Sequence, residues 1–260
     1  MSAGVSQSPA IGQTYEVMGT VVSFIVHAGQ LSDAAVHSAI TRACETLRES
    51  DETFSTWKPQ SPMSRLRRGE AAIAELPPEV ASVLGLCECV REASGGWFDP
   101  WAMPGGVDPT GLVKGWAAER ALAELVRVGI PAAMVNAGGD LAVHGRPSPE
   151  EPWRVGIRHP WRVDALACII EADAAVATSG AYERGEHLID PHNGTAITRA
   201  VSATVTGPSL AIADALATAL VVAGASEIGF VTALAGYDAY VISPDGSETA
   251  SSGIRFAPSA

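Results

Sequence analysis

The sequence predicts an α+β fold with a largely antiparallel sheet and flanking helices. Apolar residues at helical spacing dominate the first half of the chain, and strand patterns dominate the second half. The strands follow one another at hairpin-like intervals, which favours this class over a doubly wound sheet. We expect a single domain over residues 14–252, with flexible tails at 1–13 and 253–260.

In the first half, two helices and one strand alternate with loop-rich stretches. Ser32 or Asp33 is placed to cap the first helix, because a short polar side chain there can accept a backbone N–H. The second helix begins with a proline pair and stops at a glycine pair. Residues 51–69 and 96–115 are too polar or too rich in glycine and proline for regular structure. The expected elements are a strand over 15–27 and helices over 31–50 and 77–95.

A third helix, over about 115–128, leads into the strand-rich second half. Alternating and β-branched runs indicate the strands, and an apolar run after residue 209 indicates a long helix. The pattern predicts strands within 132–145, 153–160, 167–180, 201–208 and 239–246, and helices over 210–224 and 226–235.

Composition and charge exclude several classes of protein. The 260 residues are 47% hydrophobic and 18% charged, and no apolar run reaches the roughly 18 to 20 residues of a membrane span. The N-terminal segment lacks the basic and apolar regions of a signal peptide, so we expect a cytoplasmic protein without a lipid anchor. The net charge of −12 argues against a nucleic-acid partner. A polyanionic ligand would need a cation, a lysine or backbone N–H groups.

The four cysteines do not indicate a metal site. Cys87 and Cys89 lie two apart in a predicted helix and therefore do not share a face. We interpret them, with Cys44 and Cys168, as buried free thiols of a reducing compartment.

Four polar, glycine-rich stretches interrupt the apolar elements and are candidate phosphate-binding loops. Glycine lets the backbone approach a ligand closely, and its N–H groups can then face a phosphate. No Rossmann, Walker A, G-x-S-x-G, H-E-x-x-H or C-x-x-C motif is present. The stretches are 107–115, 135–140, 177–194 and 212–218.

The segment IADALAT places two oxygen-bearing side chains on one helix face. Asp214 and Thr218 are four residues apart, so both can reach one hard cation. Alternatively, Asp214 caps or solvates the helix and Thr218 bonds back to a carbonyl. The rest of the helix is apolar all round, so Asp214 is expected to be partly buried, and a buried carboxylate requires a partner.

Two further stretches carry candidate residues. Lys114 precedes the predicted third helix and suits a phosphate, although a plain surface lysine would fit the sequence equally well. In EHLIDPHNG, His187 and Asp190 could serve as acid and base. Asp190 could instead stabilise the turn that Asp-Pro and Asn-Gly indicate, with His192 exposed in it. The residues alone therefore indicate an anion and divalent-cation site, but no reaction.

Eight motifs in order resemble the ApbE family of flavin transferases over nearly the whole chain. They are Met18-Gly19-Thr20, Phe54 to Trp57 with Ser61 to Leu66, Gly96 to Pro100, Asp108 to Gly115, Asn136 to Asp140, Thr178 to Gly180, His187 to Pro191, and Asp214 to Thr218. The chain departs from the family at Thr110, where glycine is common, in a short segment between Asp99 and Asp108, and in GWAAER after Lys114.

The resemblance implies an ApbE-like (T-fold-like) architecture with FAD in a cleft between lobes and Mg²⁺ at its pyrophosphate. It implies transfer of FMN from FAD to a threonine or serine of an acceptor protein, with His187 as catalytic residue and AMP released. The rivals are an FAD pyrophosphatase and a non-catalytic FAD-binding module. The metal would be held by Gly111, Asp214, Ala217 and Thr218. The residues expected to contact FAD are Met18, Trp57, Trp97, Phe98, Asp99, Asp108, Lys114, Ser179, Gly180, Ile189 and Asp190.

Overall fold

The main feature of the fold is an eight-stranded sheet in which all neighbouring strands are antiparallel. A computed structural model describes residues 10–148, 150–180, 189–195 and 200–258. The strand order β1-β2-β3-β4-β7-β8-β9-β10 is sequential apart from the excursion of β5 and β6. The predicted α+β class with a largely antiparallel sheet is therefore confirmed. The strands are β1 (Ile11–Val17), β2 (Thr20–His27), β3 (Ala132–Ala137), β4 (Asp140–His144), β7 (Ala175–Gly180), β8 (Ser202–Gly207), β9 (Asp238–Ile242) and β10 (Glu248–Ala250).

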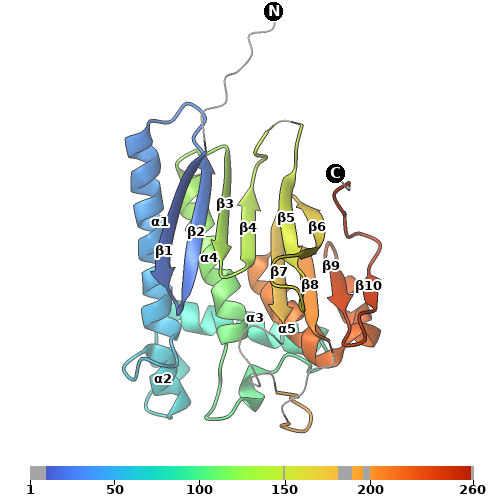
Figure 1. The fold of residues 1–260 in the computed structure, drawn as a ribbon. Coiled ribbons are helices and arrows are strands. Elements are labelled where there is room, and N and C mark those ends of the chain that lie inside the picture. Colours follow the sequence, from blue (N-terminus) through green and yellow to red (C-terminus); the bar gives the residue numbers. More distant parts are fainter. Residues whose placement is uncertain (1–9, 149, 181–188, 196–199, 259–260) are drawn as a thin grey trace, which may run out of the picture.

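The two remaining strands form a second layer. β5 (Trp153–Arg158) and β6 (Leu166–Ala172) pair with each other and lie in front of the main sheet in Figure 1. Their inward side chains pack on one face of that sheet, where Met134, Val176 and Tyr240 are buried. Successive side chains of a strand point to opposite faces of the sheet. The main sheet thus carries apolar side chains on both faces, so that each face can be covered by another layer.

Helices cover the other face of the main sheet (Figure 1). Apolar side chains of α1, α4 and α5 share one core with the alternate residues of β2, β3 and β7. The predicted helix over 210–224 is confirmed as α5, which is buried on nearly all sides. The helices are α1 (Asp33–Phe54), α2 (Pro62–Arg67), α3 (Pro78–Ala93), α4 (Thr110–Arg127), α5 (Leu210–Ala223) and α6 (Gly229–Thr232), with single 3₁₀ turns at Ile73–Glu75, Pro100–Ala102 and Ala225–Glu227.

The single strand predicted over residues 15–27 is wrong, because a tight turn divides it. Met18 and Gly19 have φ values of +56° and +68°, and Val17 pairs directly with Thr20. Two central residues with positive φ define the type I′ hairpin turn, which matches the twist of the strands on either side. Glycine adopts this conformation without strain, but methionine does so rarely.

The loop predicted over residues 51–69 is partly helical. Ser32 is the N-cap of α1, and this helix continues to Phe54, whose side chain is 1% exposed. A second cap then starts α2, where the Ser61 hydroxyl accepts the Ser64 N–H. Burial of Phe54 and this cap outweigh the polar composition of the stretch.

Helix α4 begins five residues earlier than predicted. Its first residue is Thr110, whose N–H donates to Oδ1 of Asp108 at 3.1 Å. This side-chain acceptor satisfies one of the N–H groups left over at a helix start. Lys114 therefore lies one turn inside the helix and does not precede it.

Residues within both expected tails contact the folded chain. Ile11 and Gly12 pair with β2. Near the other end, Ile254 is 8% exposed, and the N–H of Ala257 donates to the carbonyl of Ile169 at 2.8 Å. These hydrogen bonds extend the folded part of the chain beyond both expected boundaries, at residues 14 and 252.

The cysteines follow the predicted pattern only in part. Cys44 and Cys87 are buried free thiols, Cys168 is half-buried, and Cys89 is exposed. The expectation of burial is wrong for Cys89 because a residue two positions after buried Cys87 points to another side of α3. Within the described ranges, no helix combines the length and apolarity that a membrane crossing requires.

Candidate functional site

Helices α4 and α5 meet closely at the point where they carry the predicted phosphate and metal side chains. A Cβ atom on Gly115 would lie 2.5 Å from the carbonyl oxygen of Leu210, so the approach requires glycine. The N–H of Gly115 donates to Oδ2 of Asp214 at 3.1 Å. Asp214 is 2% exposed, so its carboxylate is even more completely buried than the partial burial that the sequence predicts. A buried carboxylate requires such partners.

Asp214 and Thr218 lie one turn apart on α5, as their spacing predicts, and neither is a solvated surface residue. The Thr218 hydroxyl lies 3.2 Å from Oγ of Ser179, at the end of β7. Across from it, a Cβ on Gly111 would come within 3.7 Å of Oγ1 of Thr218, so the start of α4 lies close to this hydroxyl. Ala217 is fully buried on the same helix.

These oxygen atoms suit a hard divalent cation. Magnesium typically binds one or two protein carboxylates and completes its shell with water and substrate phosphates. Over the described ranges, no three His, Cys, Asp or Glu side chains come together as a metal cluster. One carboxylate, one hydroxyl and nearby backbone therefore fit Mg²⁺ better than a transition metal.

Lys114 joins this group from α4 and is not a solvated surface lysine. Its side chain is 19% exposed, and its ammonium forms an ion pair with Asp140 and lies 3.9 Å from Oδ1 of Asp214. A partly desolvated ammonium beside a candidate cation site can contact an anionic ligand as a point charge.

Asp140 is a site residue that the sequence interpretation missed. It follows the turn of Gly138 and Gly139, and its side chain is 1% exposed. Besides pairing with Lys114, its Oδ1 accepts the Thr178 N–H at 2.9 Å. An acidic residue that opens an otherwise apolar strand was the available signal, because buried carboxylates require partners.

In the WFDP segment, the side chain of Phe98 lies beside Gly111 in the candidate site, whereas the side chain of Asp99 makes local contacts. Phe98 is 5% exposed, and a Cβ on Gly111 would come within 3.3 Å of its ring. Asp99 accepts the N–H of Trp101 at 2.9 Å and lies 3.6 Å from the Arg91 guanidinium, so its carboxylate caps the following 3₁₀ turn.

Asp108 is likewise engaged by its surroundings. Its Oδ2 pairs with Arg67 at 2.7 Å, while Oδ1 accepts the N–H that starts α4. Arg67 also donates to the carbonyl of Pro104 at 2.9 Å. The pair thus connects α2 to the loop before α4 and orients the helix that carries Lys114.

The structure supports the turn interpretation of Asp190. Its carboxylate is 1% exposed and accepts the backbone N–H of His192 at 2.9 Å and the Asn193 side-chain amide at 3.1 Å. The His192 ring, half exposed as expected, packs edge-on against Trp97 at 4.4 Å between centroids. His187 lies outside the described residues, whereas Ile189 is half-buried beside the turn and Gly180 is buried at the end of β7.

Two predicted contact residues lie at turns or loops. Met18 is half-buried in its hairpin turn, and the adjacent Thr20 packs against the turn before Asp140, since a Cβ on Gly138 would lie 2.5 Å from the Thr20 hydroxyl. Trp57 is 92% exposed on the loop between α1 and α2. Its predicted contact with FAD stays a prediction.

Glu119 fixes the start of α5 from the side of α4. Its carboxylate accepts the backbone N–H of Leu210, and the Ser209 hydroxyl lies 3.2 Å from it. Burial raises the pKa of Glu119, while these hydrogen bonds act in the opposite direction. Together with Gly115, this contact sets the register of α4 against α5.

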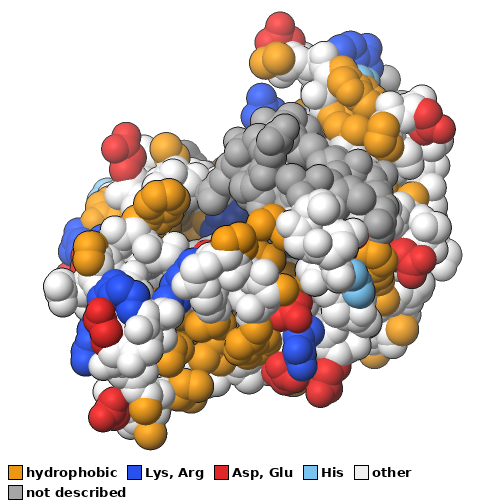
Figure 2. All heavy atoms as spheres, turned by 90° about the horizontal axis from the view of Figure 1, so that it is seen from below, with side chains coloured by type: hydrophobic (Ala, Val, Ile, Leu, Met, Phe, Trp, Pro, Cys, Tyr) orange, Lys and Arg blue, Asp and Glu red, His pale blue; other side chains and the backbone are white. Residues whose placement is uncertain are grey.

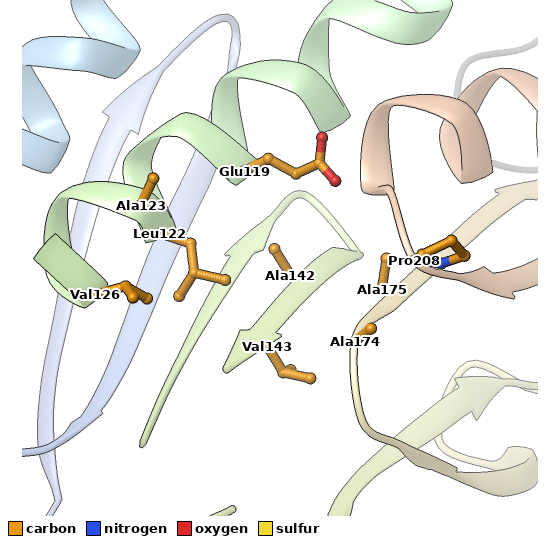
Figure 3. Close-up of a pocket in the computed structure, with 9 residues that line it drawn as sticks. All are labelled: Glu119, Leu122, Ala123, Val126, Ala142, Val143, Ala174, Ala175 and Pro208. Carbon is orange, nitrogen blue, oxygen red and sulfur yellow. The ribbon is translucent and has the colours of Figure 1, made fainter. Parts of the chain in front are cut away.

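A small pocket lies beyond Glu119, between α4 and the junction of β4 with β7 (Figure 3). Its volume is about 280 Å³, and alanine, valine and leucine side chains make up most of its lining. It lacks the cationic groups that an anionic dinucleotide requires. We therefore place the candidate site at Lys114, Asp140, Asp214 and Thr218 and not in this pocket.

The end of the molecule shown in Figure 2 has no uniform charge. Lysine and arginine side chains are interspersed there with acidic and hydrophobic ones. In a chain of net charge −12, an anionic ligand would depend on specific local groups such as Lys114.

Comparison with known proteins identifies the family. The model of the ApbE family matches residues 18–106 and 104–241, which together span most of the chain. The chain belongs to the ApbE family. The resemblance drawn from the eight motifs is thereby confirmed.

Relatives of known name match part of the chain. A FAD:protein FMN transferase of Rhodobacter capsulatus is 36% identical over 151 residues, or 54% of this chain and 29% of that protein. One of Vibrio cholerae is 39% identical over 130 residues, or 45% of this chain and 39% of that protein. The chain thus matches less than half the length of these ApbE-family relatives.

Solved structures share the fold over nearly the full chain. The flavin transferase ApbE of Vibrio cholerae superposes with a TM-score of 0.80 at 24% identity, covering 94% of this chain and 98% of that chain. The ApbE protein of Thermotoga maritima gives a TM-score of 0.82 at 22% identity, covering 94% and 97%. The fold of this chain is therefore that of the ApbE flavin transferases.

Proposed function

We propose that this chain is a Mg²⁺-dependent FAD:protein FMN transferase. It would move the FMN half of FAD to a threonine or serine hydroxyl of an acceptor protein and release AMP. The observation that carries the proposal is the convergence of Lys114, Asp214 and Thr218 between α4 and α5 in a chain of the ApbE family. Relatives with the name FAD:protein FMN transferase support it.

The metal would be held by Asp214 and Thr218 through side-chain oxygens, with backbone oxygens near Gly111 and Ala217. Burial of Asp214 and the close approach of Gly111 to the Thr218 hydroxyl support this assignment. When bound, Mg²⁺ would offset the charge of the pyrophosphate and of the departing AMP. Lys114 would add a positive charge on the same side.

The remaining predicted residues would position the flavin and nucleotide parts of FAD. Phe98 supplies an apolar wall beside Gly111, and Trp97 stacks edge-on with the His192 ring of the 190–194 turn. Asp99, Asp108 and Asp190 are held by local hydrogen bonds, so we propose that they shape the walls and contact FAD through their backbone segments. Fixed walls reduce the entropy cost of placing the reacting groups.

In the proposed reaction, the acceptor hydroxyl oxygen forms a bond to the FMN phosphorus. The P–O bond to the AMP phosphate breaks, and AMP leaves with the electron pair of that bond. His187, which precedes the described turn, is the predicted base for the hydroxyl proton. The product is FMN joined to the acceptor by a phosphoester, so no oxidant or reductant takes part.

Two other functions remain to be distinguished. In an FAD pyrophosphatase, water would attack in place of the acceptor hydroxyl and give free FMN and AMP. In a binding module, FAD would be held without reaction. The buried Asp214 beside Thr218 and Lys114 argues against the binding module, because simple binding does not require a cation site at the pyrophosphate.

The test is to incubate the purified protein with FAD, Mg²⁺ and a threonine-containing acceptor domain, and to measure intact masses. We expect the acceptor to gain one FMN, and chelation of Mg²⁺ or replacement of the acceptor threonine by alanine to abolish the gain. FMN and AMP without acceptor gain would favour the pyrophosphatase. Intact bound FAD would favour the binding module.

A further inference from the structure

Lys114 lies between two buried carboxylates that come from different elements. Its ammonium pairs with Asp140 at the start of β4 and lies 3.9 Å from Oδ1 of Asp214 on α5. The side chains of the two acids are only 1% and 3% exposed. The pairing is unequal, because the ammonium is in direct contact with Asp140 and stands off from Asp214.

Asp140 is held on its far side by the backbone. Its Oδ1 accepts the Thr178 N–H at 2.9 Å, which joins the start of β4 to β7. Asp140 is fully buried, so water does not replace these partners of its carboxylate. A carboxylate fixed in this way can set where the ammonium lies.

One oxygen of the Asp214 carboxylate is likewise held by a backbone group. Its Oδ2 accepts the Gly115 N–H at 3.1 Å, and Oδ1 is the oxygen on the side of Lys114. If the ammonium moved the short distance to Oδ1, it would compete with a divalent cation for this oxygen. Two cations at one carboxylate oxygen also repel each other strongly in a poorly solvated site.

We infer that Asp140 is a positioning residue that holds the Lys114 ammonium away from Oδ1 of Asp214 and so limits its competition with Mg²⁺ for that oxygen. The inference rests on the proposed function, because it presupposes a metal at Asp214. It assigns to the acid of the N-A-G-G-D turn a role in metal affinity that is exerted through Lys114 and not by direct ligation.

The first variant is Asp140→Asn, which removes the charge and keeps an oxygen that can accept the Thr178 N–H. Binding of Mn²⁺, used in place of Mg²⁺, is measured without FAD from the electron paramagnetic resonance signal of the free ion. We expect the dissociation constant to rise about 10- to 100-fold, the usual effect of losing a group that orients a metal site. Asp173→Asn is the control, since Asp173 pairs with Arg146 and Arg255 on an exposed surface, and it should leave Mn²⁺ binding unchanged.

A double-mutant cycle separates positioning from simple charge. If Asp140 acts through Lys114, then Asp140→Asn should have almost no effect on Mn²⁺ binding when Lys114 is already glutamine. If Asp140 attracted the ion directly through space, its loss would weaken binding equally in both backgrounds. That second result would overturn the inference. Lys114→Gln retains a donor toward Asp140, which limits the cost of an unpaired buried carboxylate.

The outcomes distinguish this inference from the proposed function. If the wild type and the Asp140→Asn variant bind Mn²⁺ with equal affinity, the positioning role alone is overturned. Wild-type protein that binds no Mn²⁺ would overturn both the metal assignment and the positioning role. Circular dichroism of each variant verifies folding, and Asp140→Ser, which is smaller but still hydrogen-bonding, replaces the asparagine variant if that one does not fold.

Discussion

The backbone N–H of Gly115 donates to the carboxylate of Asp214, so a main-chain group of α4 orients a side chain of α5. The hydrogen bond is possible because residue 115 has no side chain. A Cβ there would clash with α5, at 2.5 Å from the carbonyl oxygen of Leu210 and 3.0 Å from the nitrogen of Ala211. One glycine therefore permits the helix contact and also supplies a partner for a buried carboxylate.

Replacement of Gly115 by alanine should separate the two helices. A methyl group against fixed backbone cannot be accommodated by a side-chain rotation, so we expect a loss of about 1–3 kcal/mol in the free energy of unfolding. Urea denaturation measures this loss. Gly85→Ala is the matched control, because Gly85 is also helical and its Cβ would meet nothing within 4 Å. That substitution should be neutral or stabilising, and equal losses in both variants would contradict the proposed contact.

Thr218→Val should weaken metal binding while it preserves the shape of the side chain. The hydroxyl is a predicted metal ligand and also lies 3.2 Å from the Ser179 hydroxyl, so the substitution removes both interactions. Titration with Mg²⁺, followed by the rise in melting temperature, should show at least about tenfold weaker binding. Ser179→Ala removes only the hydrogen bond. If it weakens binding as much as Thr218→Val, the hydroxyl of Thr218 has a structural role and not a ligating one.

The fold class and most elements could be predicted because they follow from local patterns. Alternation and short spacing indicated the strands of the second half, and the apolar run after Ser209 indicated α5. The turn at Met18 was missed because methionine rarely adopts positive φ, so Gly19 was the sole local signal that separates β1 from β2. The early start of α4 was missed because its cap comes from the side chain of Asp108 within a segment rich in glycine and proline.

The candidate site could be predicted only where spacing on one element determined it. Asp214 and Thr218 share a helix face at any tertiary arrangement, and the structure places both as expected. The ion pair of Lys114 with Asp140 joins α4 to β4, and the cap of Glu119 joins α4 to α5. Such contacts depend on the packing of distant segments, which periodicity within one element does not specify.

The buried carboxylate of Glu119 should make stability depend on pH. Its pKa is raised by burial above the ordinary value of 4.5, so the folded state binds a proton more readily than the unfolded state. The contribution of Glu119 to stability is therefore greatest at low pH and falls as pH rises through the raised pKa. Glu119→Gln keeps an acceptor for the Leu210 N–H and cannot titrate. The free energy of unfolding of the wild type, minus that of the variant, should decrease between pH 4.5 and neutrality. A difference that is constant or rises would show that the pKa is not raised.

The hairpin turn at Met18 should show a conflict between stability and function. Methionine at φ +56° is strained, whereas asparagine before glycine is the preferred pair for a type I′ turn. Met18→Asn should therefore raise the free energy of unfolding by up to about 1 kcal/mol. It should also weaken FAD binding several-fold, because Met18 is a predicted contact that a shorter polar side chain cannot replace. Denaturant melts and FAD titration by flavin fluorescence measure the two effects. Higher stability with unchanged FAD affinity would remove Met18 from the binding site, and lower stability would mean that the methionine packs better than its backbone strain suggests.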